Sequence, residues 1–350
     1  MSKVASISIS DLVRDNIKEL KPFSSARSEY KGQADILLDA NEMPYANDHN
    51  RYPDPAHTEL RRLLADNYGI PSDRIVLGNG SDELIDMIMR TFGEPGKDVV
   101  RYINPTFGMY PVYADVNDLK KEAVDLEDDF DLNVDKTLAG QTPQHKLLFL
   151  CSPNNPTGNL LSEAKILRVL EGWSGVVVVD EAYIEFAERE SLISRLDEYP
   201  LLIVLQTFSK AKGGAGLRIG AAYASKDICD YLWKVKPPYN ISTYSQQRAV
   251  ELMSAPDKLK KIAEELTASR KLMEQELAKI SGIEKVYPSD ANFILMRCED
   301  HLALYRYLVD RGIVIRDRSK LKGCDRCLRV TVGTPEENQA LITSVNEYYA

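Results

Sequence analysis

The chemistry in this sequence centres on a lysine, Lys210, which directly follows a hydroxyl-bearing residue, Ser209. Asp180, thirty residues earlier, ends a short apolar run. A turn-forming segment, residues 152–158, precedes that run, and Arg218 comes eight residues after the lysine. One stretch of the chain therefore supplies an amine, a carboxylate, hydroxyl groups and a fixed positive charge.

Each of these groups matches one part of pyridoxal 5'-phosphate. A lysine amine condenses with the aldehyde of this cofactor, and a carboxylate keeps its pyridine nitrogen protonated. Hydroxyl groups and an arginine bind its phosphate. The order and the spacing of the four groups therefore predict a pyridoxal 5'-phosphate site.

Both central residues also have a simpler interpretation. Lys210 alone could be an ordinary surface lysine with a pKa of about 10.4, and Asp180 could cap a helix that begins at residues 181–183. We favour the cofactor because a carboxylate at the end of a buried strand needs a partner. Open α/β sheets also bind their ligands at that edge. Burial beside cations would lower the pKa of the lysine.

Further polar groups are expected around the same cofactor. Asn155 and Tyr183 could donate hydrogen bonds to its ring oxygen. Ser81 and Asp82 follow two glycines at the start of a predicted helix. Backbone amides at the positive end of a helix dipole suit a phosphate, so we expect this segment to share the phosphate with Ser209 and the arginine.

Two arginines occur late in the chain. Arg329 lies inside a β-branched run, residues 328–332, and Arg316 ends the apolar run 313–316. A charge inside such a strand is unusual unless it meets an opposite charge. We interpret Arg329 as the anchor for an anionic group of the substrate, with Arg316 as its helper. The alternative is a structural ion pair with an acidic side chain.

Length and charge narrow the class of protein. A chain of 350 residues can bury a large domain and a smaller one. The net charge of −9 argues against a nucleic-acid or an anionic membrane partner. No long apolar region follows residues 1–4, so we expect no signal peptide, and no apolar run reaches the length of a membrane span.

The cysteines point to a reducing compartment. Their number, five, is odd, which favours free thiols and a cytoplasmic location. Cys324 and Cys327 have a spacing found in zinc and redox sites. No second Cys or His pair lies near them, so we predict no metal site.

The elements that must position these groups follow from the apolar pattern. Helices are expected at residues 55–68 and 82–92, where apolar side chains recur at helical spacing. Between and after such patterns come runs that are apolar throughout, which indicates parallel strands buried on both faces. The expected strands are residues 99–103, 146–150, 176–179, 201–205 and 219–223.

The end of the chain has a different pattern, in which short strands mix with a few helices. A long amphipathic helix is expected at residues 256–280, and Pro335 suits the first turn of the last helix. The other expected elements are strands at residues 284–287, 292–297, 313–316 and 327–332 and a helix at residues 301–311.

We therefore predict an α/β protein with a mostly parallel sheet covered by helices on both faces. Residues 1–30 form an amino-terminal arm with one short helix, which starts at Ser10 and ends at Pro22. Residues 31–255 form the large, cofactor-binding domain, and residues 256–350 form a smaller α+β domain.

The chain resembles the fold-type-I pyridoxal-phosphate aminotransferases and, within them, the histidinol-phosphate aminotransferase family. The similarity runs roughly from residue 38 to residue 345. Its motifs are residues 38–42, 51–54, 105–110, 152–158, 180–186, 207–211, 215–218 and 328–334. The asparagine-containing turn and the lysine segment are shared by many fold-type-I enzymes. The combination of residues 51–53, 180–186 and 328–334 is more specific.

The resemblance implies reversible amino transfer between L-histidinol phosphate and 2-oxoglutarate in histidine biosynthesis. The products are imidazole-acetol phosphate and glutamate, and the mechanism is ping-pong through a Schiff base with Lys210. The lysine then carries a proton between the substrate carbon and the cofactor. Arg329 would bind the substrate phosphate in one half-reaction and the glutamate carboxylate in the other.

The resemblance also implies roles for residues that the pattern alone does not explain. Tyr52 would reach the cofactor phosphate across a two-fold interface, so the active unit is expected to be a homodimer. Phe107 would stack on the cofactor ring, and Phe23 in the arm would contact the substrate. Relatives often have tyrosine at both phenylalanine positions, and residues 212–214 replace a more apolar stretch. None of these departures removes a catalytic group.

Other functions on the same scaffold stay open at this point. A threonine-phosphate decarboxylase also binds a phosphorylated amine, and an aromatic-amino-acid aminotransferase shares the first chemical steps. A regulator that senses the cofactor without turnover would need a helix-turn-helix segment, and the arm is too short to supply one.

Overall fold

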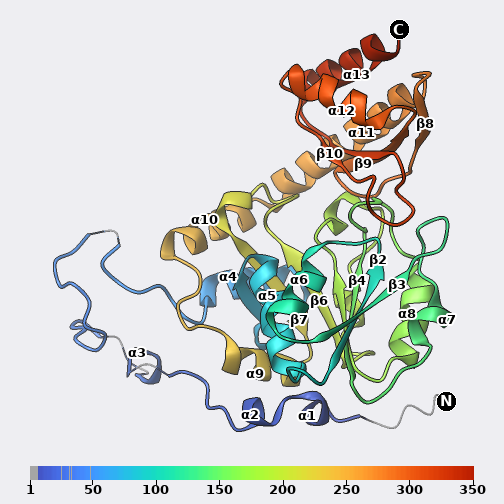
Figure 1. The fold of residues 1–350 in the computed structure, drawn as a ribbon. Helices are drawn as coiled ribbons and strands as arrows, with labels where there is room; N and C mark the ends of the chain where they lie inside the picture. Colours follow the sequence, from blue (N-terminus) through green and yellow to red (C-terminus); the bar gives the residue numbers. More distant parts are fainter. Residues whose placement is uncertain (1–6, 25, 31, 33, 48) are drawn as a thin grey trace.

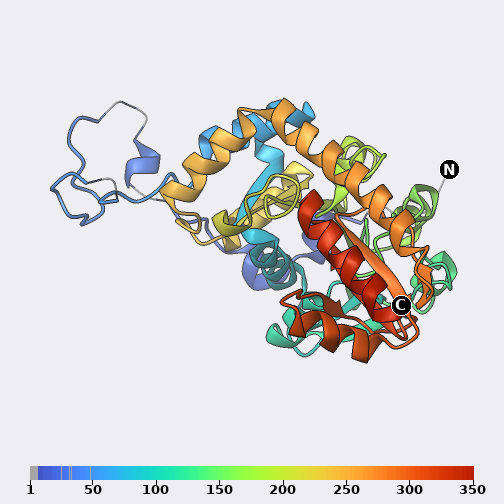
Figure 2. The same cartoon turned by 90° about the horizontal axis from the view of Figure 1, so that it is seen from above.

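The computed structural model describes residues 7–24, 26–30, 32, 34–47 and 49–350. Its main feature is a seven-stranded sheet, and a separate four-stranded sheet lies beyond one edge of it (Figure 1). The long helix α11 (Pro256–Leu277) runs from the first sheet to the second, which Figure 2 shows from above. The start of the chain, residues 1–4, used above to argue against a signal peptide, lies outside the described residues.

The large sheet has the spatial order β1-β7-β6-β5-β4-β2-β3. The five strands β6, β5, β4, β2 and β3 run parallel to one another. Strand β7 is antiparallel to both of its neighbours, β1 and β6. The strands are β1 (Ile75–Asn79), β2 (Val99–Asn104), β3 (Lys120–Asp125), β4 (His145–Cys151), β5 (Val176–Asp180), β6 (Leu202–Thr207) and β7 (Ile219–Ala224).

The five strands predicted in this region are all present, with ends that differ by one or two residues. A mostly parallel sheet was predicted, and this is confirmed. Of the five predicted strands, β7 alone runs against its neighbours, because an apolar run does not encode direction. Two strands were missed. The edge strand β3 is mostly polar and exposed, and β1 ends in glycine and asparagine, which indicated a loop.

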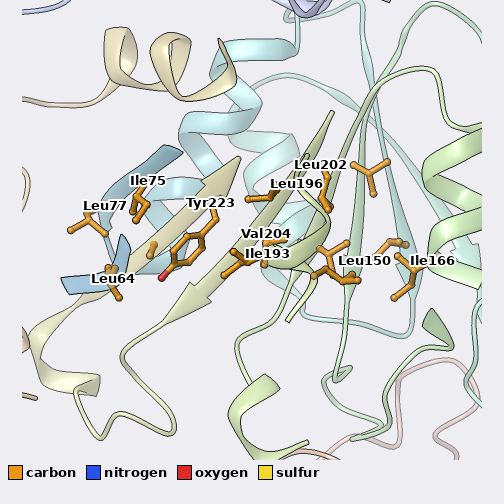
Figure 3. Packing of buried hydrophobic residues seen from close by; sticks show 14 of the residues in the cluster. Leu64, Ile75, Leu77, Leu150, Ile166, Ile193, Leu196, Leu202, Val204 and Tyr223 are labelled. Carbon is orange, nitrogen blue, oxygen red and sulfur yellow. The ribbon is translucent and has the colours of Figure 1, made fainter. Parts of the chain in front are cut away.

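Successive side chains of the central strands pack into two cores, one on each face of the sheet. In β4, Leu147 and Phe149 belong to one core, while Leu148 and Leu150 belong to the other. Figure 3 shows part of the second core, to which Leu150 of β4, Val204 of β6 and Tyr223 of β7 contribute. This arrangement explains why the strands read as continuous apolar runs.

Helices from different parts of the chain cover the two faces. The first face is covered by α1 (Ile9–Leu12), α2 (Asp15–Lys18), α5 (Gly80–Phe92), α6 (Met109–Val116) and α9 (Lys226–Val235). The second face is covered by α4 (Thr58–Tyr68), α7 (Val134–Leu138), α8 (Glu163–Gly172) and α10 (Thr243–Met253). Short 3-10 turns are η1 (Ser72–Arg74), η2 (Ile184–Phe186), η3 (Leu192–Arg195) and η4 (Ala215–Leu217).

The predicted early helices differ from the structure mainly at their ends. Helix α4 begins three residues late because His57 has a left-handed backbone, with φ at 50°, and it stops where Gly69 has φ at 64°. The arm was expected to carry one helix from Ser10 to Pro22. It carries two short ones instead, and α3 (Ala26–Glu29) follows.

The four-stranded sheet is antiparallel throughout and packs against three helices. Its spatial order is β10-β11-β9-β8. Its strands are β8 (Ile283–Val286), β9 (Phe293–Cys298), β10 (Arg316–Asp317) and β11 (Cys327–Thr331), and its helices are α11, α12 (His301–Asp310) and α13 (Pro335–Tyr349). The predicted strand at residues 313–316 was wrong except for Arg316, because only two residues there pair with β11.

The last helix begins as the sequence predicts. Pro335 occupies its first turn, and Thr334 and Glu337 form a reciprocal capping box that satisfies two amide groups. This cap fixes the helix directly after β11.

The segment between α2 and α4 stands away from the rest of the molecule in both views (Figures 1 and 2). It exposes large apolar side chains, including Ile36 at 78%, Leu38 at 87% and Tyr45 at 80% exposure. Such side chains are unfavourable in water unless another surface covers them. In the described part of the chain, none of the helices combines the length and the apolar character that a bilayer crossing requires.

The two-faced core predicts a clear contrast between two leucines. Replacement of the fully buried Leu148 by Ala is expected to lower the free energy of unfolding by about 2–5 kcal/mol, because it leaves a cavity in the central strand. The same replacement at Leu272, which is 63% exposed on α11, should change it by less than about 0.5 kcal/mol. Chemical denaturation at fixed protein concentration measures both. Equal losses would contradict the assignment of the core.

Candidate active site

A cavity of about 570 Å³ lies at the carboxyl edge of the large sheet, facing the β10–β11 hairpin of the small sheet. It gathers most of the predicted site residues from across the chain. Those that line it are Ser81, Asp82, Phe107, Asn155, Asp180, Tyr183, Ser209, Lys210, Arg218, Arg316 and Arg329.

The sheet topology explains how these residues meet. Strands β4, β5 and β6 are parallel, so the segments that follow them, with Asn155, Asp180 and Lys210, emerge at one edge. Strand β7 runs the other way, and its first residues therefore lie at the same edge: Gly220 pairs with Thr207. The reversed strand thus brings Arg218 back to the lysine that precedes it in the chain.

Lys210 is accessible from the cavity, and its Nζ lies 5.6 Å from the centre of the Tyr183 ring. Surrounding protein atoms lower the pKa of Lys210, and the positive charge of Arg329 lowers it further, against the opposing effect of Asp180. The amine is therefore a better nucleophile than a free lysine.

Asp180 is buried, and both of its carboxylate oxygens are hydrogen-bonded. Oδ2 accepts from the hydroxyl of Tyr110 at 2.8 Å, and Oδ1 accepts from the backbone N–H of Ala182 at 3.1 Å. Burial raises the pKa of Asp180 to about 6 despite these bonds. The local capping bond that we considered is present, but it leads into a turn and not into an α-helix.

Tyr110 was missed as a partner of Asp180, although it lies in one of the motifs of the resemblance. Its ring is fully buried between Phe149, at 5.0 Å between ring centres, and Phe107, at 5.6 Å. No sequence pattern links α6 to β5, so only the tertiary fold reveals this contact. Tyr110 therefore fixes both the carboxylate and the aromatic wall of the cavity.

Three polar side chains form a chain of hydrogen bonds beside the lysine. Arg329 donates from Nη1 to Oδ1 of Asn155 at 2.5 Å, and Asn155 donates from Nδ2 to the hydroxyl of Tyr183 at 3.4 Å. The guanidinium of Arg329 also lies 5.1 Å from the centre of the Phe293 ring. The two predicted ring-oxygen donors are thus connected to the predicted substrate anchor.

The start of helix α5 forms a cradle with Arg218. The Arg218 guanidinium contacts Asp82 Oδ2 at 3.4 Å and Ser209 Oγ at 3.5 Å. Gly80 has φ at +79°, and a Cβ there would lie 2.6 Å from Arg218 Nη2. Asp82 Oδ1 is buried without a hydrogen-bond partner. A glycine is therefore required for the backbone amides and the arginine to converge.

The β10–β11 hairpin presents three arginines to the cavity: Arg316, Arg318 and Arg329. Among the ion pairs formed by described residues, none includes any of the three. The structural ion pair that we considered for the two predicted arginines is therefore absent from this part of the chain. Arg318 was missed, although its place two residues after Arg316 puts it on the same side of an extended strand.

Two predicted site residues lie outside this cavity. Phe23 and Tyr52 both contact Tyr239, with ring centres 6.1 Å and 4.5 Å apart. Tyr52 is 51% exposed and lines a separate surface depression of about 410 Å³ with Glu42. Within one chain the structure does not bring these two side chains to Lys210, so their roles remain predictions.

Of the cysteines, Cys151 lines the cavity, next to Asp180 in the pairing of β4 with β5. All five are free thiols, and Cys324 and Cys327 are buried without a disulfide between them. Over residues 7–24, 26–30, 32, 34–47 and 49–350, no group of three or more His, Cys, Asp or Glu side chains is arranged as a metal site.

The donor set of the cavity fits pyridoxal 5'-phosphate. The glycine cradle beside Arg218 leaves backbone amides and a cation for a phosphate. Asp180 is a buried carboxylate, and burial raises its pKa to about 6, so a cationic group beside it would stabilise its charge. Lys210 is an accessible amine with a lowered pKa. These features would serve the phosphate, the ring nitrogen and the aldehyde of the cofactor.

Comparison with known proteins gives the same picture. Residues 28–345 match the family model of aminotransferase class I and II. A histidinol-phosphate aminotransferase of Cytophaga hutchinsonii is 47% identical over 97% of this chain and 99% of its own length. The histidinol-phosphate aminotransferase structure of Sinorhizobium meliloti in complex with pyridoxal-5'-phosphate has a TM-score of 0.77, with 26% identity over 86% of this chain and 84% of that one.

The fold is shared more widely than the sequence. The L-threonine-O-3-phosphate decarboxylase structure of Porphyromonas gingivalis has a TM-score of 0.74, with 24% identity over 85% of this chain and 90% of that one. This likeness concerns the fold alone, which is the fold of type I pyridoxal-phosphate transferases. Because the extended identity lies with the aminotransferases, the chain belongs to the histidinol-phosphate aminotransferase family, within the aminotransferases of class I and II.

Proposed function

We propose that this protein transfers an amino group between L-histidinol phosphate and 2-oxoglutarate, as a step of histidine biosynthesis, with pyridoxal 5'-phosphate as cofactor. The observation that carries the proposal is one cavity that joins the Lys210 amine to arginines without acidic partners. The identity of 47% to a histidinol-phosphate aminotransferase supports this substrate pair.

The residues of the cavity divide into those for the ring and those for the phosphate. Asp180 would hold the proton on the pyridine nitrogen, and Asn155 with Tyr183 would donate to the ring oxygen. Phe107 would stack on the ring. The remaining polar residues near α5, namely Ser81, Asp82, Ser209 and Arg218, would hold the phosphate.

The cofactor, when bound, carries the amino group between the two substrates and withdraws electrons from the substrate carbon that loses its proton. Lys210 is the base for that proton, because burial lowers the pKa of its amine and so favours the neutral form more than in a free lysine. Asp180, held by Tyr110, keeps a negative charge beside the ring nitrogen and so maintains the proton there. Arg329 fixes an anionic end of either substrate beside the lysine.

We also propose that two copies of the chain form a homodimer in which Tyr52 of one copy reaches the cofactor phosphate of the other. The exposed apolar side chains of the segment between α2 and α4, such as Leu38 at 87% exposure, support an intermolecular partner. Phe23 in the same segment would then contact the substrate.

We also propose that the chain is divided into an arm, residues 1–30, a large domain, residues 31–255, and a small domain, residues 256–350. The five free cysteines support a cytoplasmic location.

The first experiment tests the half-reaction. Addition of L-histidinol phosphate to the purified holoenzyme, without any oxo acid, should remove the visible absorbance of the bound cofactor, and 2-oxoglutarate should restore it. Carbon dioxide release from threonine phosphate without an oxo acid would instead favour the decarboxylase. Turnover of aromatic amino acids but not of histidinol phosphate would favour the aromatic aminotransferase.

The second prediction concerns the covalent link to the cofactor. Borohydride reduction of the wild-type holoenzyme should fix the cofactor to the peptide that contains Lys210, as measured by mass spectrometry. In Lys210→Ala the cofactor should bind only weakly and without a covalent link, and turnover should fall by at least about 10⁴-fold because the base is lost as well. Lys226→Ala, on the exposed face of α9, is the control. Retained labelling in Lys210→Ala would refute the assignment.

The third prediction separates a shared site from a self-contained one. Tyr52→Ala and Lys210→Ala should each be nearly inactive, but an equal mixture, unfolded and refolded together, should recover about a quarter of wild-type activity. A mixed dimer would contain one site with an intact lysine and an intact tyrosine. If the mixture stays as inactive as its components while mixed dimers form, Tyr52 does not act across the interface.

A further inference from the structure

Three arginines lie on one side of the small sheet. Arg316 and Arg329 are directly opposite each other in the antiparallel pairing of β10 with β11. Arg318 directly follows β10, and its side chain lines the same cavity as those of Arg316 and Arg329. Its backbone N–H donates to the carbonyl of Cys327 at 2.9 Å, which holds it in the hairpin.

This arrangement is electrostatically unfavourable by itself. Like charges directly opposite each other in a sheet repel, and no acidic side chain of the described residues forms an ion pair with any of the three. The carboxylates that line the cavity are engaged elsewhere, since Asp82 contacts Arg218 and Asp180 accepts from Tyr110. The cavity therefore holds an excess of positive charge that only a bound anion can balance.

The three arginines are not equivalent. Arg329 already donates from Nη1 to Asn155, and Arg316 is exposed. Arg318 is half-buried and, like Arg329, has a buried Nε without a hydrogen-bond partner, but its guanidinium donates to none of the described residues. Burial lowers the pKa of Arg318 to about 10, and the charges of Arg329 and Arg316 add to this effect. Arg318 is thus the arginine of the three with the least compensation inside the protein.

We propose that Arg318 is a specificity-determining residue that adds a further guanidinium group to the anion site of Arg316 and Arg329, and so favours the doubly charged phosphate monoester of the substrate. The inference rests on the proposed function and adds a basis for substrate preference to it. A phosphate monoester carries close to two negative charges at pH 7 and three acceptor oxygens. It can bind more guanidinium groups at one point than a single carboxylate group can.

The phosphate of the cofactor is expected elsewhere. The cradle at the start of α5 has its own arginine, Arg218, and the glycine geometry described above. Arg318 belongs to the opposite wall of the cavity, on the small sheet. A phosphate at Arg318 would therefore come from the substrate or from free phosphate in solution, and the two sources can be separated by experiment.

The test compares Arg318→Gln with two matched variants. Arg318→Lys keeps the charge without the planar pair of donors, and Arg326→Gln removes an arginine of the same hairpin that pairs with Glu284 at 2.8 Å and does not line the cavity. We expect Arg318→Gln to lower kcat/KM for L-histidinol phosphate by about 10- to 100-fold. The glutamate half-reaction should change by less than about threefold, because Arg316 and Arg329 remain for its two carboxylates. Arg318→Lys should be intermediate, and Arg326→Gln should resemble the wild type.

A second readout does not need the proposed substrate. Ethyl phosphate should inhibit the glutamate half-reaction, and its inhibition constant should fall as pH rises from 5 to 7, because the ester gains its second charge with a pKa of about 6. Arg318→Gln should flatten this dependence. Inorganic phosphate as the probe, tested in the same way, shows whether a free anion is bound as well as an ester.

The outcomes distinguish a failure of the proposed function from a failure of the role assigned to Arg318. Failure of the wild type to react with L-histidinol phosphate would overturn the proposed function, while the ethyl phosphate comparison would still test Arg318. Equal losses for both substrates in Arg318→Gln, an unchanged pH dependence, or the same losses in Arg326→Gln would overturn that role. Tighter binding of inorganic phosphate than of ethyl phosphate in the wild type would also overturn the preference for an ester.

Discussion

A buried carboxylate at the end of the central strand is the constraint on which the site depends. Asp180 is buried at the edge where the parallel strands end, and removing its carboxylate from water costs free energy. Its two hydrogen bonds, from Tyr110 and the backbone of Ala182, compensate only part of that cost. Tyr110 can donate because it is fixed between Phe149 and Phe107. The packing of one face of the sheet therefore sets the charge at the centre of the cavity.

Strand β7 is antiparallel to its neighbours, so its first residues lie at the cavity edge of the sheet. Its first residues pack directly against the start of α5: a Cβ on Gly220 would lie 2.4 Å from the backbone nitrogen of Ser81. Only glycine permits this approach. The contact holds Arg218 over the helix start, so the phosphate cradle and the lysine segment share one rigid support.

The sequence predicted those features that are local in the chain. Strand β5 and its terminal Asp180 form one continuous pattern, and Lys210 follows its strand within a few residues. The direction of β7, the partner Tyr110 and the third arginine, Arg318, were not predicted. Each of them depends on which segments become neighbours after folding, and one-dimensional periodicity does not contain that information. The polar edge strand β3 was missed for a related reason, because its exposure removes the apolar signal.

The charge distribution has a functional consequence that follows from the two sheets together. The chain as a whole carries a net charge of −9, yet the small sheet turns three arginines toward the lysine of the large sheet. An acidic exterior repels nucleic acids and other polyanions, whereas a concave positive site with low-dielectric walls concentrates small anions. Alternation along β11 produces the positive wall, because Leu328 and Val330 face the helices while Arg329 faces the cavity. The orientation of the small sheet therefore determines which anions bind. The reaction at Lys210 on the large sheet depends on that binding.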